Sequence, residues 1–176
     1  MGNLNTNAVI DAVDDNDRVI GEQNRRDIAS TKANFRTVHL FGFNDDGSLL
    51  VQYIAPGHRS DGKWGSTVAG YVLAGETYEA ACKRKIADEL RISLPTIRLI
   101  GKTSMTDLGV TKFITLYAGI LNSVPDFDRQ QISRMQFFPS THIQDTLENH
   151  PEMFTDTFRL LYEYYCEKQG ESRLSG

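Results

Sequence analysis

The sequence has few cysteines, no long apolar run and little net charge. Only two of its 176 residues are cysteine, Cys82 and Cys166, and they lie too far apart in sequence for a metal-binding motif. A disulfide framework is therefore not expected, and a reducing, cytoplasmic compartment fits best. No apolar stretch approaches the roughly 20 residues that span a bilayer. A net charge of −4 does not favour a nucleic-acid or membrane partner.

The length is that of one domain, residues 1–176, in which residues 1–10 are polar enough to be a mobile tail. Alternating apolar residues between turn formers predict strands at 36–43, 48–54, 96–105, 112–121 and 132–138, with two short strands within 11–22. Helical spacing predicts helices near 77–90, 140–149 and 158–165. Strands before, between and after helices predict an α+β fold, a mixed β-sheet sandwiched between α-helices.

The first of these helices has a clear start and a clear apolar face. Thr77 can cap it, because a threonine hydroxyl accepts a backbone N–H of the first turn. Tyr78, Cys82, Ile86 and Leu90 recur every four residues and form one stripe. We therefore expect one helix from about residue 77 to 90, packed on the sheet by this stripe.

The segment 70–92 carries the chemistry of the chain. Gly70 is followed after six residues by Glu76, and eight residues later by Arg84, which opens Arg-Lys-Ile-Ala-Asp-Glu. This spacing resembles the box of the Nudix hydrolases, a loop–helix–loop that holds a divalent metal over a diphosphate. The flanking residues 13–21 resemble the branch related to isopentenyl-diphosphate isomerase. The resemblance spans roughly residues 11–165 and implies the Nudix fold and Mg²⁺ or Mn²⁺ as cofactor.

The sequence departs from the family pattern at three separate places. Where the box has Arg-Glu-x-x-Glu-Glu and then glycine, this chain has Lys85, Asp88 and Arg91 at the changed positions. Residues 53–54 stand where the branch has two arginines. Gln131 and Arg134 stand where it often has glutamates. Together these departures indicate either a changed substrate or abandoned metal catalysis.

The resemblance assigns roles to particular residues. Glu89 and Arg84 are the candidate catalytic residues, and Glu89, Asp88 and Glu76 are the candidate metal ligands. The candidate substrate-binding residues are those that could contact phosphate or stack on a ring: Tyr53, His58, Arg59, Lys63 and Lys85.

A simpler interpretation exists for each group. Residues 85, 88 and 89 share one helix face, so Lys85 can pair with Glu89 and Arg84 with Asp88 at i, i+4, giving a solvated, salt-bridged surface. The loop at 56–63 could be an ordinary charged loop. Tyrosines 162, 164 and 165 of the last helix favour packing or a homodimer contact over a ligand cage.

The first hypothesis for function is a diverged Nudix hydrolase that cleaves a diphosphate bond in a small nucleotide-linked or related molecule with a divalent metal. The alternative is a catalytically inactive Nudix-fold module that binds a ligand or protein. The isomerase reaction is disfavoured, because the positions that the resemblance assigns to its cysteine and histidines hold Ala69, Tyr71 and Phe35.

Overall fold

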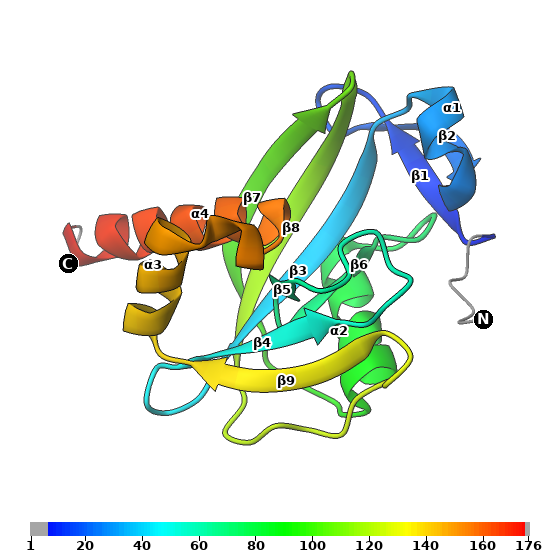
Figure 1. The fold of residues 1–176 in the computed structure, drawn as a ribbon. Coiled ribbons are helices and arrows are strands. Elements are labelled where there is room, and N and C mark those ends of the chain that lie inside the picture. The colour runs from blue at the N-terminus through cyan, green and yellow to red at the C-terminus, as the bar shows by residue number, and fades with distance from the viewer. Residues whose placement is uncertain (1–6, 175–176) are drawn as a thin grey trace.

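The computed structural model describes residues 7–174, which form a mixed β-sheet with helices on both faces (Figure 1). The predicted α+β sandwich is confirmed. The strands are β1 (Val9–Val13), β2 (Val19–Asn24), β3 (Phe35–Phe43), β4 (Leu49–Ile54), β5 (Trp64–Gly65), β6 (Val68–Tyr71), β7 (Arg98–Asp107), β8 (Val110–Ile120) and β9 (Ile132–Phe138). The α-helices are α1 (Ile28–Thr31), α2 (Tyr78–Leu90), α3 (Ser140–Asn149) and α4 (Asp156–Leu174).

Strand β3 lies at the centre of the main sheet. It pairs in parallel with β8 along its whole length and antiparallel with β6 and β4 along its other edge. The strand order is β5-β4-β3-β8-β7, with β9 on the far side of β4. The box segment enters this sheet through β6, so the loop that precedes α2 is held by the central strand.

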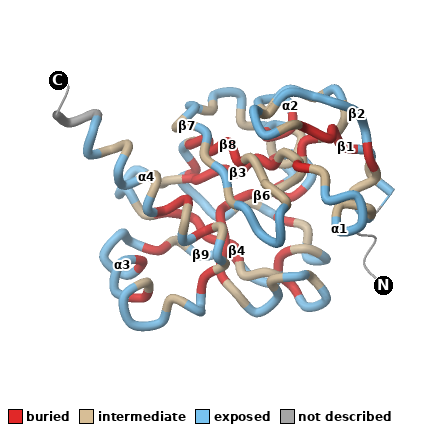
Figure 2. The backbone as a smooth tube through the Cα atoms, turned by 90° about the horizontal axis from the view of Figure 1, so that it is seen from above, coloured by how far each residue is buried: buried red, intermediate tan, exposed pale blue. Residues whose placement is uncertain are grey.

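Successive residues of the central strands serve two separate cores. Val38 and Leu40 of β3 pack under α2, whereas Phe41 packs under α3 and α4. In β4, Leu50 faces α2 and Leu49 faces α4, as the alternation of side chains along a strand requires. Figure 2 shows the buried residues concentrated along these strands, while the outer loops are exposed.

The predicted helix at 77–90 is confirmed. The Thr77 side chain accepts a hydrogen bond from Ala80 N–H, and α2 begins at the next residue. Of the predicted stripe, Cys82, Ile86 and Leu90 are fully buried. The helix ends because Arg91 adopts a left-handed conformation with φ 54°, which a glycine would adopt with less strain.

The N-terminal hairpin β1–β2 forms a separate two-stranded sheet anchored by buried charge. The Asp17 carboxylate accepts hydrogen bonds from Arg36 Nε at 2.6 Å, from Tyr78 Oη at 2.9 Å and from Lys102. Burial alone would raise the pKa of Asp17, but these donors outweigh it and lower that pKa below its ordinary value. Residues 9–10 of the predicted tail belong to β1, and Ile10 is fully buried, whereas residues 1–6 of that tail lie outside the described residues.

Within residues 7–174, no helix is both long and apolar enough to cross a membrane.

The Asp17 anchor predicts a pH-dependent stability. Asp17→Asn keeps the left-handed backbone at φ 61°, which asparagine tolerates, but removes the charge that faces Arg36 and Lys102. We expect a loss of about 2 kcal/mol in the free energy of unfolding at pH 7. Because the folded pKa lies below the unfolded one, the stabilisation is present above the unfolded pKa and lost as pH falls through the folded pKa. Urea unfolding at pH 7 and pH 3 should show the difference shrinking in acid.

The matched control is Asp126→Asn, which removes the exposed pair that Asp126 makes with Arg91 at 2.8 Å. That change should cost under about 0.5 kcal/mol at either pH. Equal losses for the two variants would contradict the anchoring role of Asp17.

Candidate functional site

Glu76, in the loop before α2, forms a two-point ion pair with Arg84 of that helix. Arg84 donates from Nε to Glu76 Oε1 at 2.6 Å and from a terminal nitrogen to Glu76 Oε2 at 2.9 Å. The same guanidinium reaches the Tyr71 carbonyl at 3.0 Å, and Leu73 N–H donates to Glu76 Oε2 at 2.9 Å. Glu76 and Arg84 therefore tie the loop after β6 to the first turns of α2.

These contacts fix the charge of both groups. Burial would raise the pKa of Glu76, but the donors on Arg84 and Leu73 lower it below its usual range. The Arg84 pKa is raised, chiefly by its hydrogen bond to Glu76. A paired carboxylate of this kind has both oxygens engaged, so Glu76 is occupied as a structural partner.

Lys85 and Glu89 form a buried ion pair one turn further along α2. Lys85 Nζ lies 2.8 Å from Glu89 Oε1, and the exposed fractions of the two side chains are only 13% and 4%. The predicted ion pair between Lys85 and Glu89 at i, i+4 is therefore confirmed, but the predicted solvated surface is wrong for this pair. It describes Arg84 and Asp88 better, since they lie 3.5 Å apart and the Asp88 side chain is 54% exposed.

Gly70 explains how a lysine fits at this depth. A Cβ atom at residue 70 would lie 2.6 Å from the Cγ, Cδ and Cε atoms of Lys85. The lysine stem thus runs directly over the glycine backbone of β6, and no larger residue could stand at position 70 without displacing it. The close approach of α2 to β6 holds the ammonium against Glu89.

The two oxygens of the Glu89 carboxylate have different surroundings. Its Oε1 faces Lys85, whereas its Oε2 is buried without a hydrogen-bond partner among the described residues. Burial raises the pKa of Glu89, and the Lys85 ammonium and the backbone at Ala69 only partly oppose that effect. Such a carboxylate takes up a proton more readily than an exposed one.

The three carboxylates assigned to a divalent ion do not meet at one point. Glu76 is turned to Arg84, Asp88 faces solvent beside Arg84, and Glu89 is held by Lys85. Across residues 7–174, no group of three or more histidine, cysteine or acidic side chains could hold a metal ion. Because Glu76 and Glu89 are already paired with cations and the three carboxylates do not converge, this donor set does not fit a divalent ion as it stands.

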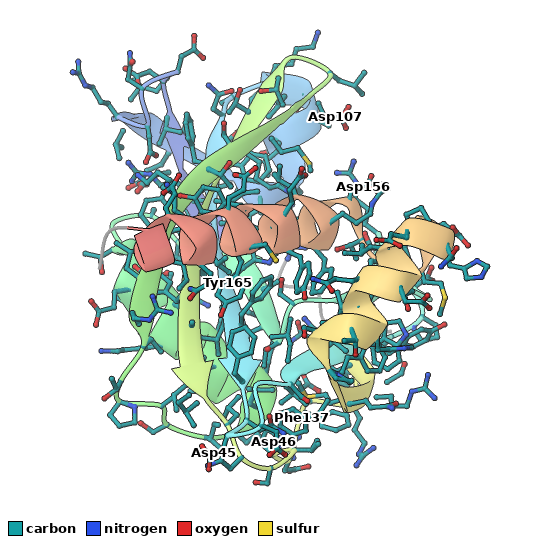
Figure 3. All side chains as sticks on the ribbon, turned by 90° about the vertical axis from the view of Figure 1, so that its left-hand side faces the viewer. Asp45, Asp46, Asp107, Phe137, Asp156 and Tyr165 are labelled. Carbon is teal, nitrogen blue, oxygen red and sulfur yellow. The ribbon has the colours of Figure 1, made fainter. Side chains whose placement is uncertain are left out.

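The predicted substrate-binding residues of the loop before Trp64 have different polar partners. His58 Nε2 lies 3.1 Å from the carbonyl of Gln130, in the loop before β9. Arg59 instead faces Asp107, the last residue of β7, at 3.6 Å, and Lys63 lies close enough to Asp156 to contribute to lowering that residue's pKa. Figure 3 shows Asp156 where α4 begins and Asp107 near the tip of the β7–β8 hairpin.

The rings of Tyr53 and Trp64 both contact Arg134, which stands where the related branch often has a glutamate. The Arg134 guanidinium lies 5.3 Å from the centre of the Tyr53 ring and 4.9 Å from that of Trp64. The two rings contact each other edge to face at 5.0 Å. Trp64 is buried, and Tyr53 packs with it in the core under α3 and α4 rather than beside Lys85.

The loop before β9 reaches α2 through a residue that the sequence analysis missed. Asp128 N–H donates to the Glu89 carbonyl at 2.8 Å, and its side chain accepts from Gln130 N–H at 3.0 Å and from Gln131. The Gln130 N–H is the main cause of its lowered pKa, and Lys85 contributes a smaller part. The Asp-x-Gln turn signal could have marked Asp128, but its position beside Lys85 depends on the fold.

The positions assigned to the isomerase histidines hold an aromatic pair. The rings of Phe35 and Tyr71 stack with their centres 5.4 Å apart, and the Arg25 guanidinium lies 4.5 Å from the Tyr71 ring centre. His39 lies four residues further along β3, on the same face as Phe35, and its ring is buried against Ser66 at 2.9 Å, where burial chiefly lowers its pKa to about 3. A histidine held neutral in this way does not join the box.

A cavity of about 1020 Å³ lies at the other end of the sheet, and none of the predicted site residues lines it. It opens between the β3–β4 turn, α3 and the second half of α4, near Tyr165 in Figure 3. Tyr162 is buried there, and Tyr165 stacks on Phe43 at 5.2 Å. The packing interpretation of these tyrosines is therefore supported.

Comparison with known proteins agrees with the fold and the box. A family model described as NUDIX domain matches residues 33–158. An uncharacterised Nudix hydrolase of Nostoc is 29% identical, over 90% of this chain and 96% of its own length. An isopentenyl-diphosphate Delta-isomerase of Photorhabdus laumondii is 23% identical, over 84% of this chain and 86% of its own length. The resemblance carried by the box is confirmed.

Solved structures show the same architecture. The crystal structure of DR0079 from Deinococcus radiodurans has a TM-score of 0.77 and 25% identity, and the match covers 89% of this chain and 99% of that one. The NUDIX domain of Shewanella oneidensis NrtR, solved with ADP ribose, has a TM-score of 0.60 and 19% identity, over 84% of this chain and 99% of that one. At this identity the second match shows the fold alone.

The buried pair predicts an asymmetric response to mutation. Lys85→Met leaves Glu89 buried without its cation, and we expect a loss of about 3 kcal/mol in the free energy of unfolding at pH 7. The double variant Lys85→Met/Glu89→Gln removes both charges and should recover most of that loss. Urea unfolding of both variants measures the difference.

The control for this prediction is Lys83→Met on the same helix, which breaks the exposed pair with Glu79 at 2.6 Å. It should cost under about 0.5 kcal/mol. If Lys85→Met were as mild as Lys83→Met, the Lys85–Glu89 pair would be contributing no more than a surface ion pair.

Proposed function

This chain belongs to the Nudix domain family, and on that ground we propose that it is a diverged Nudix hydrolase acting on the diphosphate bond of a small nucleotide-linked or related molecule. The observation that carries the proposal is Glu89. It is the unaltered carboxylate of the core triplet, it is buried beside an ammonium, and one of its oxygens has no partner among the described residues. A base and a cation thus stand side by side on the helix that gives the family its activity.

The proposed chemistry uses the opposite charges of this pair. A diphosphate is a polyanion, and the Lys85 ammonium can contact its oxygens as a point charge. The oxygen of a water molecule attacks phosphorus, the bridging P–O bond breaks, and the second phosphate leaves as an anion. Glu89 takes the proton from the water, and its raised pKa brings its basicity nearer to neutral pH.

Burial couples substrate binding to the release of the base. Lys85 holds Glu89 at 2.8 Å and both side chains are largely shielded from solvent, so Glu89 has little contact with water in this state. A diphosphate that draws the ammonium away from Glu89 would free the carboxylate at the moment the substrate arrives. Arg84 would act as a positioning residue, because it holds Glu76 and the Tyr71 carbonyl in place.

The other parts of the proposal follow from the same arrangement. His58 is the remaining substrate-binding candidate on the side of the loop before β9, whereas Arg59 and Lys63 face the α4 side. A Mg²⁺ or Mn²⁺ ion that neutralises the diphosphate would belong to the substrate, since the carboxylates of α2 are engaged. A cytoplasmic location is consistent with the free cysteines at 82 and 166.

One observation favours a second function, a Nudix-fold module that binds a diphosphate-containing ligand without turnover. The Lys85–Glu89 pair neutralises the carboxylate on which hydrolysis depends. If this ion pair stayed closed when a ligand binds, Glu89 could not act as a base, while the fold and the positive charge of Lys85 would remain. The two functions differ in a single measurable property, which is the release of phosphate or nucleotide product after binding.

The test is a hydrolysis screen over diphosphate compounds, including ADP-ribose, with Mg²⁺, with Mn²⁺ and with chelator. Wild type should release product from at least one compound, and Glu89→Gln should lower kcat/KM on the order of a hundredfold, since each ~1.4 kcal/mol of transition-state stabilisation is about tenfold. Glu79→Gln, an exposed change on the same helix, should leave kcat/KM unchanged.

Folding must be followed alongside activity, because Glu89→Gln leaves Lys85 buried and unpaired. Assays are therefore run well below the unfolding midpoint of each variant. Near wild-type turnover by folded Glu89→Gln would contradict the role of Glu89. A wild type that binds ADP-ribose by calorimetry but releases no product from any compound would establish the binding module instead.

A further inference from the structure

We propose that the Lys85 ammonium is a built-in replacement for a divalent cation on Glu89, and that removing it uncovers a divalent-metal site on this face of α2. The inference concerns the site of the proposed function but does not rest on turnover. It would hold equally for a hydrolase and for a binding module.

The first support is the position of the ammonium. Lys85 Nζ sits 2.8 Å from Glu89 Oε1 on the buried face of the helix. Its stem is confined by the Gly70 backbone, where even a single added carbon would lie 2.6 Å from it. The charge is therefore held at the carboxylate by packing, unlike a surface lysine that samples many positions.

The second support is the balance of charge along this face. Glu76 is matched by Arg84, Glu89 by Lys85, and Asp88 lies 3.5 Å from the same Arg84. Three carboxylates thus face two cations, and a divalent ion would meet a net charge of only about −1. Mg²⁺ and Ca²⁺ are held by several oxygen ligands at once, which this neutralised set does not offer.

The third support is the unused oxygen of Glu89. Its Oε2 is buried without a hydrogen-bond partner among residues 7–174, so the carboxylate has not satisfied its capacity to accept. Without the ammonium, Glu89 Oε1 would lose its cation as well, and Asp88 stands one residue away on the same helix. A carboxylate introduced at position 85 would complete an i, i+3, i+4 cluster on one face.

The experiment is a Mn²⁺ titration by calorimetry and by electron paramagnetic resonance, on wild type and on Lys85→Glu. Wild type should bind Mn²⁺ no tighter than about millimolar, and Lys85→Glu should bind at least about tenfold tighter, because a repelling charge is exchanged for a ligand. Lys85→Gln, whose amide can still donate to Glu89, should lie between the two. The triple-carboxylate site should vanish again in Lys85→Glu/Glu89→Gln.

The matched control is Lys83→Glu, which makes the same charge change on the same helix but at an exposed position paired with Glu79. It should bind Mn²⁺ like wild type. The proposal is overturned if wild type binds Mn²⁺ as tightly as Lys85→Glu. It is equally overturned if Lys85→Glu and Lys85→Gln, folded by circular dichroism, bind no tighter than Lys83→Glu.

A silent hydrolysis screen would count against the proposed enzyme activity and leave these binding expectations unchanged. Conversely, if wild type hydrolyses diphosphates but Lys85→Glu gains no Mn²⁺ affinity, the proposal that Lys85 replaces a divalent cation is overturned and the hydrolase activity stands. Should Lys85→Glu fail to fold, Lys85→Gln and the wild-type titration still decide the outcome.

Discussion

The close approach of α2 to the central sheet is the constraint on which the rest of the site depends. Strand β3 is paired on both edges, so β6 and the loop that follows it have a fixed place. Ile86 and Leu90 then press the helix onto β6, until the stem of Lys85 lies against Gly70. A charge carried so deep needs a counter-charge, and Glu89 supplies it.

Within the box, the same constraint gives the charged residues two different roles: some hold the loop on the helix, and Glu89 is left for chemistry. Glu76 and Arg84 keep the loop on the helix, and both side chains are used fully in doing so. Glu89 keeps a buried oxygen that has no hydrogen-bond partner among residues 7–174, and burial raises its pKa. The family scaffold is therefore preserved around a carboxylate whose partner is a lysine.

Family membership and chemistry are thus distinct conclusions. The NUDIX domain match and the similar structures follow from the sheet, the helix and the box spacing. The arrangement of charged residues on α2 is a property of this sequence and does not follow from the family match. It bears on whether α2 binds a divalent ion. Phe35 and Tyr71, at the positions that the resemblance assigns to isomerase histidines, form a stacked aromatic pair instead.

The sequence by itself determined the longer helices and strands and the family resemblance, since helix and strand periods, the Thr77 cap and the box spacing are local properties. It also identified Lys85 and Glu89 as neighbours at i, i+4. Only the tertiary structure decided that this pair is buried, because burial depends on β6 lying under the helix. The division of His58 from Arg59 and the place of Asp128 were decided there too, since contacts between distant segments carry no local signal.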